Sequence, residues 1–245
     1  MSDTALPVYQ PDSSLTRALV VVAHPDDIDF GMAGTMAVLT GHGVDVAYCL
    51  VTSGDAGGDA STLTKDERAQ IREAEQTAAA AAVGVSNLTF LRWPDGEVEP
   101  TLELRKAISR VNRTHRPDLV ITQNPERNFE RIYASHPDHM AAGEATLRAV
   151  YPDARNPHAF PELLEEGFIP HAVATVWVGG LTPNLVVDIT DTFPAKIAAL
   201  KSHVSQVGHR DDLEETMRAW ATTGAETGGL APGRLGETFR VVNTA

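Results

Sequence analysis

The chain has little of what defines several large classes of protein. It holds one cysteine in 245 residues, which excludes an internal disulfide and a cluster of thiolate metal ligands. No apolar run approaches the roughly 20 residues of a membrane-spanning helix, and the first residues do not resemble a secretory signal. Twenty Lys and Arg against 33 Asp and Glu give a net charge of −13, which argues against general nucleic-acid binding. We therefore expect a cytoplasmic protein that neither spans a membrane nor binds nucleic acid.

The rest of the composition is that of an ordinary globular domain, with 42% hydrophobic and 22% charged residues. Short β-branched runs alternate with longer helical patterns, and the uninterrupted run at 18–23 predicts a central strand that is buried on both faces. Further strands are predicted at 44–52, 88–93 and 118–122, and helices at 34–40, 65–83, 102–115 and 140–150.

This alternation is typical of a parallel sheet with right-handed crossovers and helices on both faces. We predict one α/β domain over residues 1–245, with a Rossmann-like three-layer fold, a mostly parallel sheet and an irregular C-terminal extension. Residues 1–16 are expected to form an N-terminal extension, and the Gly-rich segment 224–236 a mobile loop over the site. The C-terminal extension is predicted to contain strands at 174–178 and 185–189 and helices at 194–207 and 213–221.

Histidines and carboxylates gather after two of the predicted strands. The first strand is followed by His24-Pro-Asp-Asp27, and the fourth by a long loop and Ser135-His-Pro-Asp-His139. Ligands of such sheets bind at the carboxyl ends of the strands, near the point where the strand order reverses, so we expect the two motifs to meet. Two imidazoles and one carboxylate with an open fourth position are typical of catalytic zinc.

Each motif then has polar groups that the metal site does not use. One aspartate of the Asp26/Asp27 pair can bind the metal while the other accepts a proton from water, because like charges beside a cation are driven to distinct roles. His136 and Asp138 can form an imidazole–carboxylate pair that favours the protonated ring. Such a ring would stabilise an oxyanion.

Several segments of the chain resemble the PIG-L or LmbE-like family of zinc-dependent de-N-acetylases. They are AHPDDIDFGMAGT, TSGDAGG, IREAE, SHPDH and DIT…KIAALKSHVSQ, within residues 18–205. The resemblance implies metal binding by His24, Asp27 and His139. It implies that Asp26 is the general base. It also implies that His136 stabilises the oxyanion and is oriented by Asp138.

The resemblance extends to residues around these groups. Arg72 resembles the arginine that holds sugar hydroxyls. Many members have glutamate directly after the two aspartates, whereas here one residue intervenes and Asp29 follows. Asp29 is therefore expected to support the metal ligands with a shorter side chain. Asn124 and Arg127, in the loop before the second motif, and Asp95 are predicted to line the substrate pocket.

The implied activity is hydrolysis of an N-acetyl group from an N-acetylglucosamine-type conjugate, a small-molecule partner, with Zn²⁺ as cofactor or Fe²⁺, Mn²⁺ or Co²⁺ in its place. A homo-oligomer is left open. The alternatives are an amidase for a larger N-acyl group, a thiol-sugar conjugate or a specialised metabolite, and a non-catalytic sugar- or nucleotide-binding protein. A phosphoesterase would usually need a second metal. No Gly-x-Gly-x-x-Gly follows the first strand, which argues against nucleotide binding.

Overall fold

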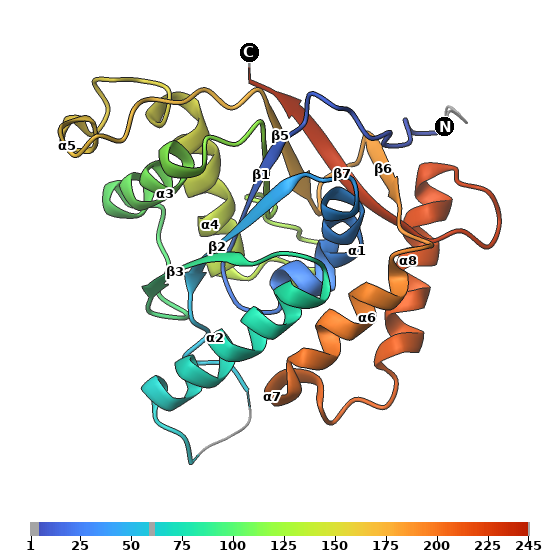
Figure 1. The fold of residues 1–245 in the computed structure, drawn as a ribbon. Helices are drawn as coiled ribbons and strands as arrows, with labels where there is room; N and C mark the ends of the chain where they lie inside the picture. The colour runs from blue at the N-terminus through green and yellow to red at the C-terminus, as the bar shows by residue number, and fades with distance from the viewer. Residues whose placement is uncertain (1–4, 59–61, 245) are drawn as a thin grey trace.

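The computed structural model describes residues 5–58 and 62–244, in which seven strands form one sheet (Figure 1). The strand order is β3-β2-β1-β4-β5-β7-β6. The first five strands in this order are parallel, and β7 runs antiparallel to β5 and β6. The strands are β1 Arg17–Val22, β2 Asp45–Thr52, β3 Asn87–Trp93, β4 Leu119–Thr122, β5 Thr175–Gly179, β6 Leu185–Asp188 and β7 Gly236–Asn243. The predicted α/β fold with a mostly parallel sheet is confirmed.

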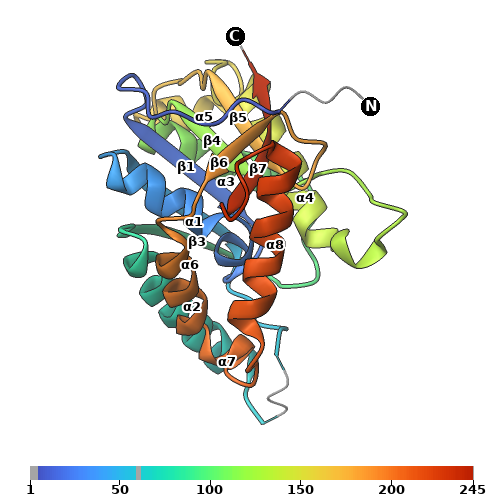
Figure 2. The same cartoon turned by 90° about the vertical axis from the view of Figure 1, so that its right-hand side faces the viewer.

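Helices cover both faces of the sheet (Figures 1 and 2). Helices α1, α2, α6 and α8 contribute to the core on one face, and α3 and α4 to the core on the other. Their bounds are α1 Asp27–Gly41, α2 Lys65–Ala82, α3 Leu102–His115, α4 Pro137–Arg148, α5 Pro161–Glu165, α6 Phe193–Ser202, α7 Val204–Val207 and α8 Leu213–Gly228, with a 3-10 turn at Ile132–Ala134 and a π-helical segment at Ala149–Asp153. Within the described ranges, no helix combines the length and the apolar character that crossing a membrane requires.

Strand β1 shows why the first apolar run is uninterrupted. Successive side chains of a strand point to opposite faces, so Val20 and Val22 enter the core beneath α1 while Leu19 and Val21 enter the core beneath α3 and α4. All four are fully buried. Since both faces are covered, neither set of positions can be polar.

The centre of the sheet is its topological switch point. Strand β1 pairs with β2 on one side and with β4 on the other, so the chain leaves β1 in one direction and later returns to its other edge. The two His/Asp motifs follow β1 and β4. The strand order therefore brings them together where the parallel-sheet rule predicts a ligand.

The C-terminal region differs from the prediction. Segment 224–236 is only partly a loop, because α8 continues to Gly228 and β7 begins at Gly236, which leaves residues 229–235 between them. A Cβ atom on Gly224 would collide with the carbonyl group of Gly236, so this glycine permits close packing of helix on strand. The helix predicted at 194–207 is divided at His203 into α6 and α7.

The predicted N-terminal extension is partly ordered against the sheet. Residues 1–4 lie outside the described residues. The Tyr9 backbone N–H donates to the Val186 carbonyl, the Val186 N–H donates to the Pro7 carbonyl, and Val8 forms a parallel bridge with Val186 on β6. This segment therefore covers part of the edge strand, which would otherwise expose unpaired backbone groups.

A buried ion pair joins β7 to α6, and its carboxylate also binds the backbone of α1. The Glu237 carboxylate lies 2.7 Å from Lys196 Nζ and accepts hydrogen bonds from the backbone N–H groups of Gly34 and Thr35. We predict that Glu237→Ala lowers the free energy of unfolding by about 3–5 kcal/mol, because Lys196 is left buried without a countercharge. Urea denaturation measures this loss. The exposed Glu226→Ala on α8 should change stability by less than about 0.5 kcal/mol, and equal unfolding midpoints for the two variants would contradict the prediction.

Candidate metal centre

The first motif forms a tight turn between β1 and α1. The backbone N–H of His24 donates to Asp27 Oδ2 at 2.7 Å. Asp26 has the left-handed backbone conformation, with φ 87° and ψ −26°, and precedes the first helical residue, Asp27. This turn directs the side chains of His24 and Asp27 to one side of the strand end.

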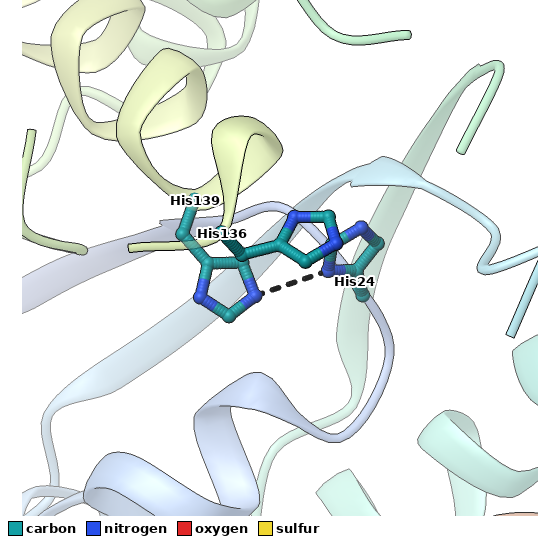
Figure 3. A group of neighbouring side chains, drawn as sticks. All are labelled: His24, His136 and His139. Atoms are coloured by element: carbon teal, nitrogen blue, oxygen red, sulfur yellow. Dashed lines mark hydrogen bonds between the residues drawn. The ribbon is translucent and has the colours of Figure 1, made fainter. Parts of the chain in front are cut away.

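The second motif opens α4. The His136 ring caps this helix, since its Nδ1 atom accepts the backbone N–H of Asp138 at 3.2 Å, and Pro137 occupies the first helical turn. His139 then lies within the first turn of α4. The helix start thus holds His136 and His139 beside the end of β1, close to His24 (Figure 3).

Three donor groups converge on one point. His24 Nδ1 lies 3.2 Å from His139 Nε2 and 3.4 Å from Asp27 Oδ2, and His139 Nε2 lies 3.0 Å from Asp27 Oδ1. A tetrahedral ion with ligand bonds of about 2.0–2.1 Å separates its donors by roughly 3.3 Å. The spacing and the His/His/carboxylate set therefore fit a divalent cation such as Zn²⁺. The His136 ring is a neighbour of this group, with nitrogen atoms of all three rings within 4.8 Å.

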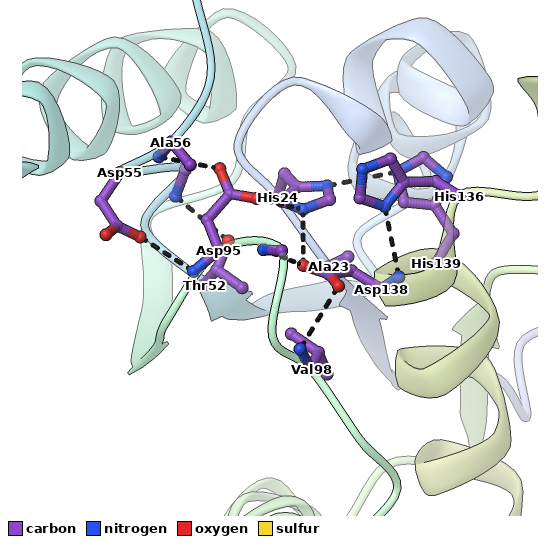
Figure 4. A network of polar contacts seen from close by, with 12 residues as sticks. Ala23, His24, Thr52, Asp55, Ala56, Asp95, Val98, His136, Asp138 and His139 are labelled. Carbon is purple, nitrogen blue, oxygen red and sulfur yellow. Dashed lines mark hydrogen bonds and ion pairs between the residues drawn. The ribbon is translucent and has the colours of Figure 1, made fainter.

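The second nitrogen of His24 faces two other carboxylates (Figure 4). His24 Nε2 lies 3.0 Å from Asp95 Oδ1 and 3.2 Å from Asp138 Oδ2. The backbone N–H groups of Gly96 and Val98, which follow β3, donate to the Asp138 carboxylate. A metal-binding histidine typically donates its other ring N–H to a carboxylate, which orients the ring. The His24 ring is oriented in this way, with Nδ1 directed to the candidate cation site.

This arrangement corrects one sequence-based expectation, the pairing of His136 with Asp138. The Asp138 side chain is hydrogen-bonded to His24 and not to His136, because the backbone N–H of Gly96, after β3, donates to its carboxylate and holds it there. Asp95, predicted to line the substrate pocket, also contacts His24, and its Oδ2 atom accepts the N–H of Ala56.

The His136 ring is also in a different state from the one predicted. Burial, followed by the positive charges of His24 and His139, holds the pKa of His136 below its ordinary value, which disfavours the protonated ring predicted from the sequence. Its Nδ1 atom accepts a hydrogen bond from the backbone and therefore lacks a proton. The proton is on Nε2, which is free to donate to a ligand oxygen.

The carboxylates around His24 stabilise positive charge at the centre of the cluster. Although burial alone would lower it, hydrogen bonds to Asp138, Asp27 and Asp95 raise the pKa of His24 to about 12. Burial would likewise raise the pKa of Asp27, but contact with His139 and His24 holds it far below its ordinary value. In the metal-free protein the proton on His24 balances these carboxylates. A divalent cation would supply that charge instead.

The two adjacent aspartates have opposite environments. Burial, and then the negative charge of Asp27, raise the pKa of Asp26 to about 7, against the opposing charge of Arg72. A carboxyl group with a pKa near neutrality can both accept and return a proton. Asp26 and Asp27 therefore differ as the sequence argument requires: one is suited to proton transfer and the other to binding a cation.

The remaining predicted residues are more dispersed. Arg72 is buried and donates to the carbonyl groups of Pro25 and Gly54 and to Asp26 Oδ2, so its guanidinium group is engaged by the protein itself. Asn124 donates to the carbonyl group of Gly180. Arg127 is exposed in the same loop.

Asp29 is fully buried and contacts Gln76 and His203 rather than the predicted metal ligands. Sequence reasoning missed Gln76, which also accepts the backbone N–H of Asp26. The available signal was its position four residues after Arg72, which places both on one face of α2.

The fold and the site define an α/β protein with a candidate cation site at the switch point of a parallel sheet. The family model described as PIG-L, GlcNAc-PI de-N-acetylase, matches residues 19–150, which is more than half of the chain. The chain belongs to the PIG-L family.

Individual relatives agree with this assignment. The chain is 34% identical over 200 residues to diacetylchitobiose deacetylase of Thermococcus kodakarensis, covering 81% of this chain and 73% of the relative. It is 31% identical over 195 residues to a probable N-acetyl-α-D-glucosaminyl L-malate deacetylase 2 of Bacillus anthracis, with coverages of 78% and 81%. The solved N,N'-diacetylchitobiose deacetylase of Pyrococcus horikoshii, complexed with its inhibitor MPG, matches with a TM-score of 0.85 and 30% identity over 94% of this chain and 84% of that chain. The predicted family and enzyme class, an N-deacetylase, are confirmed.

The geometry predicts that His139 is needed for metal binding. We expect the purified protein to bind one divalent cation per chain and His139→Ala to lose stoichiometric metal, because only two protein ligands, His24 and Asp27, would remain. Elemental analysis after dialysis measures the metal content. His158→Ala, at an exposed histidine, is the matched control and should keep the metal. Full occupancy in His139→Ala would reject His139 as a ligand.

Proposed function

We propose that this protein removes the acetyl group from N-acetylglucosamine-type sugar conjugates by metal-assisted hydrolysis. The observation that carries the proposal is the convergence of His24 Nδ1, Asp27 and His139 within 3.4 Å, beside an aspartate whose pKa is raised to about 7. The names of the relatives support the substrate class, since diacetylchitobiose and N-acetylglucosaminyl malate share an acetamido group on glucosamine.

His24, Asp27 and His139 would hold the cation, and this nitrogen and oxygen donor set suits Zn²⁺, with Fe²⁺, Mn²⁺ and Co²⁺ as chemical alternatives. When bound, the cation supplies Lewis-acid activation of water and of the amide carbonyl group. Asp26 accepts the proton of the attacking water. The same carboxyl group then returns that proton to the amine nitrogen as the C–N bond breaks.

His136 is suited to stabilise the developing negative charge. Its ring adjoins those of His24 and His139, with centroids 5.0 Å away in both cases, and its Nε2–H is not used by the helix cap. A hydrogen bond from this group to the carbonyl oxygen would strengthen as the oxygen becomes negative. A neutral imidazole N–H serves this purpose without adding a positive charge beside the divalent cation.

The loop between β4 and α4 is the part of the chain that we assign to the sugar conjugate. It leads directly into His136 and carries exposed polar groups, including Arg127, while Asn124 fixes its start against Gly180. Buried Arg72 is assigned instead to Asp26, which it contacts at 3.1 Å.

Release of free amine tests the proposed function. We expect the protein to release amine from N-acetylglucosamine and diacetylchitobiose, detected with fluorescamine, with activity lost to a chelator and restored by added Zn²⁺. The same panel should include N-butyryl and N-benzoyl glucosamine to test the acyl group. Preferential release of a longer acid would replace the acetyl assignment with a broader amidase. No amine from any substrate in the metal-loaded protein would refute the proposal.

A substitution at Asp26 tests its role as the base. Asp26→Asn keeps the size of the side chain but cannot accept the proton of water, so we expect kcat to fall roughly 10²- to 10⁴-fold with bound metal unchanged. Steady-state kinetics and elemental analysis on the same sample measure the two quantities. Asp66→Asn, at an exposed position of α2, should behave as the unmodified protein. Near-normal turnover in Asp26→Asn would remove the base assignment.

A further inference from the structure

We propose that Gln76 is a positioning residue that fixes the backbone of Asp26 through a buried hydrogen-bond relay formed by His203, Asp29 and Gln76. This inference rests on the proposed function, in which Asp26 transfers the proton. The relay joins three elements that are distant in sequence: the His203 junction of α6 and α7, the first turn of α1, and the middle of α2.

The relay is continuous and shielded from water. His203 Nε2 lies 2.7 Å from Asp29 Oδ2, Gln76 Nε2 donates to the same oxygen at 2.9 Å, and the backbone N–H of Asp26 donates to Gln76 Oε1 at 2.8 Å. The side chains of His203, Asp29 and Gln76 are fully buried. Water cannot substitute for a lost partner without entering the core.

The relay ends at a backbone that needs support. Asp26 has φ 87°, a left-handed conformation that is unfavourable for a residue with a Cβ atom. Such conformations persist where the surroundings over-determine them, and they concentrate at functional sites. The hydrogen bond from its N–H to Gln76 is a direct constraint on this conformation, and Arg72 adds a second by binding the Pro25 carbonyl and Asp26 Oδ2.

The chemistry of the partners requires glutamine at position 76. The Asp26 N–H can only donate, so the amide oxygen of Gln76 must face it, and the amide nitrogen is then directed to Asp29. Glutamate would place an oxygen against the Asp29 carboxyl oxygen, and methionine would leave the Asp26 N–H unpaired. The hydrogen bonds of Gln76 go to Asp26 and Asp29, and among the described residues none joins it to the predicted metal ligands, so its effect on the site must pass through Asp26.

The buried polar atoms around the relay indicate that it is not simply a packing device. Asp29 Oδ1 and His203 Nδ1 are buried without hydrogen-bond partners among the described residues. Unsatisfied atoms of this kind destabilise a fold, and a pair of apolar side chains would avoid them. Retaining the polar pair holds the Gln76 amide in one orientation.

The test combines a structure with kinetics for Gln76→Met, Gln76→Glu and the exposed control Gln70→Glu on the same helix. Crystal structures should show Asp26 leaving the left-handed region, or its carboxylate moving, in both Gln76 variants and not in the control. In the same proteins kcat should fall roughly 10- to 100-fold, the cost of a small misplacement of a reacting group, while KM and metal stoichiometry stay unchanged. If Gln76→Met does not fold, Gln76→Glu decides the same question. It keeps the side-chain volume, but repulsion between its second oxygen and Asp29 Oδ2 turns the carboxyl group away from the orientation that holds the Asp26 N–H.

A double-mutant cycle assigns the effect to Asp26. In the Asp26→Asn background, Gln76→Met should lower the residual kcat by less than about 2-fold, because coupled residues are not additive. An undisturbed Asp26 backbone in the Gln76 variants, an unchanged kcat, or equal kcat losses in both backgrounds would overturn the relay. Absence of deacetylation by the unmodified protein would refute the proposed function instead, and the crystal structures would still decide whether Gln76 positions Asp26.

Discussion

The carboxylates that surround the imidazole of His24 are the constraint on which the site depends. The ring of His24 has Asp27 and His139 at one nitrogen and Asp95 and Asp138 at the other. Asp95 and Asp138 orient the ring, and Nδ1 is left where a cation would satisfy the negative charge. Because both nitrogens are engaged, the ring cannot turn without breaking contacts on two sides.

Three segments of the fold supply these contacts. His24 follows β1, Asp95 follows β3, and Asp138 and His139 open α4. Parallel strands place all of these positions at one edge of the sheet, and the reversal of strand order at β1 and β4 leaves space for them. The site is therefore a consequence of topology, while the turn at Asp26 gives adjacent aspartates separate environments.

Much of the fold followed from local patterns in the sequence. The strands of the parallel region were visible because burial on both faces requires continuous apolar runs, and α2 was marked by the Thr64/Glu67 capping box that the structure contains. Strand β7 was missed, because its glycine-rich approach is typical of a loop, whereas the glycines permit helix and strand to pack closely. The site could be predicted as far as the sheet edge determines it. The partner of Asp138 could not, since it depends on the backbone at Gly96, and Gln76 acts through a peptide N–H that no motif records.

X-ray absorption at the zinc K-edge of the zinc-loaded protein tests the central claim most directly, because it reports the type, number and distance of the ligands. Our account predicts a four-coordinate ion with two imidazoles and two oxygen ligands at about 2.0–2.1 Å. Three imidazoles bound to the metal, which would make His136 a ligand, or a hydrated ion with no imidazole, would contradict it.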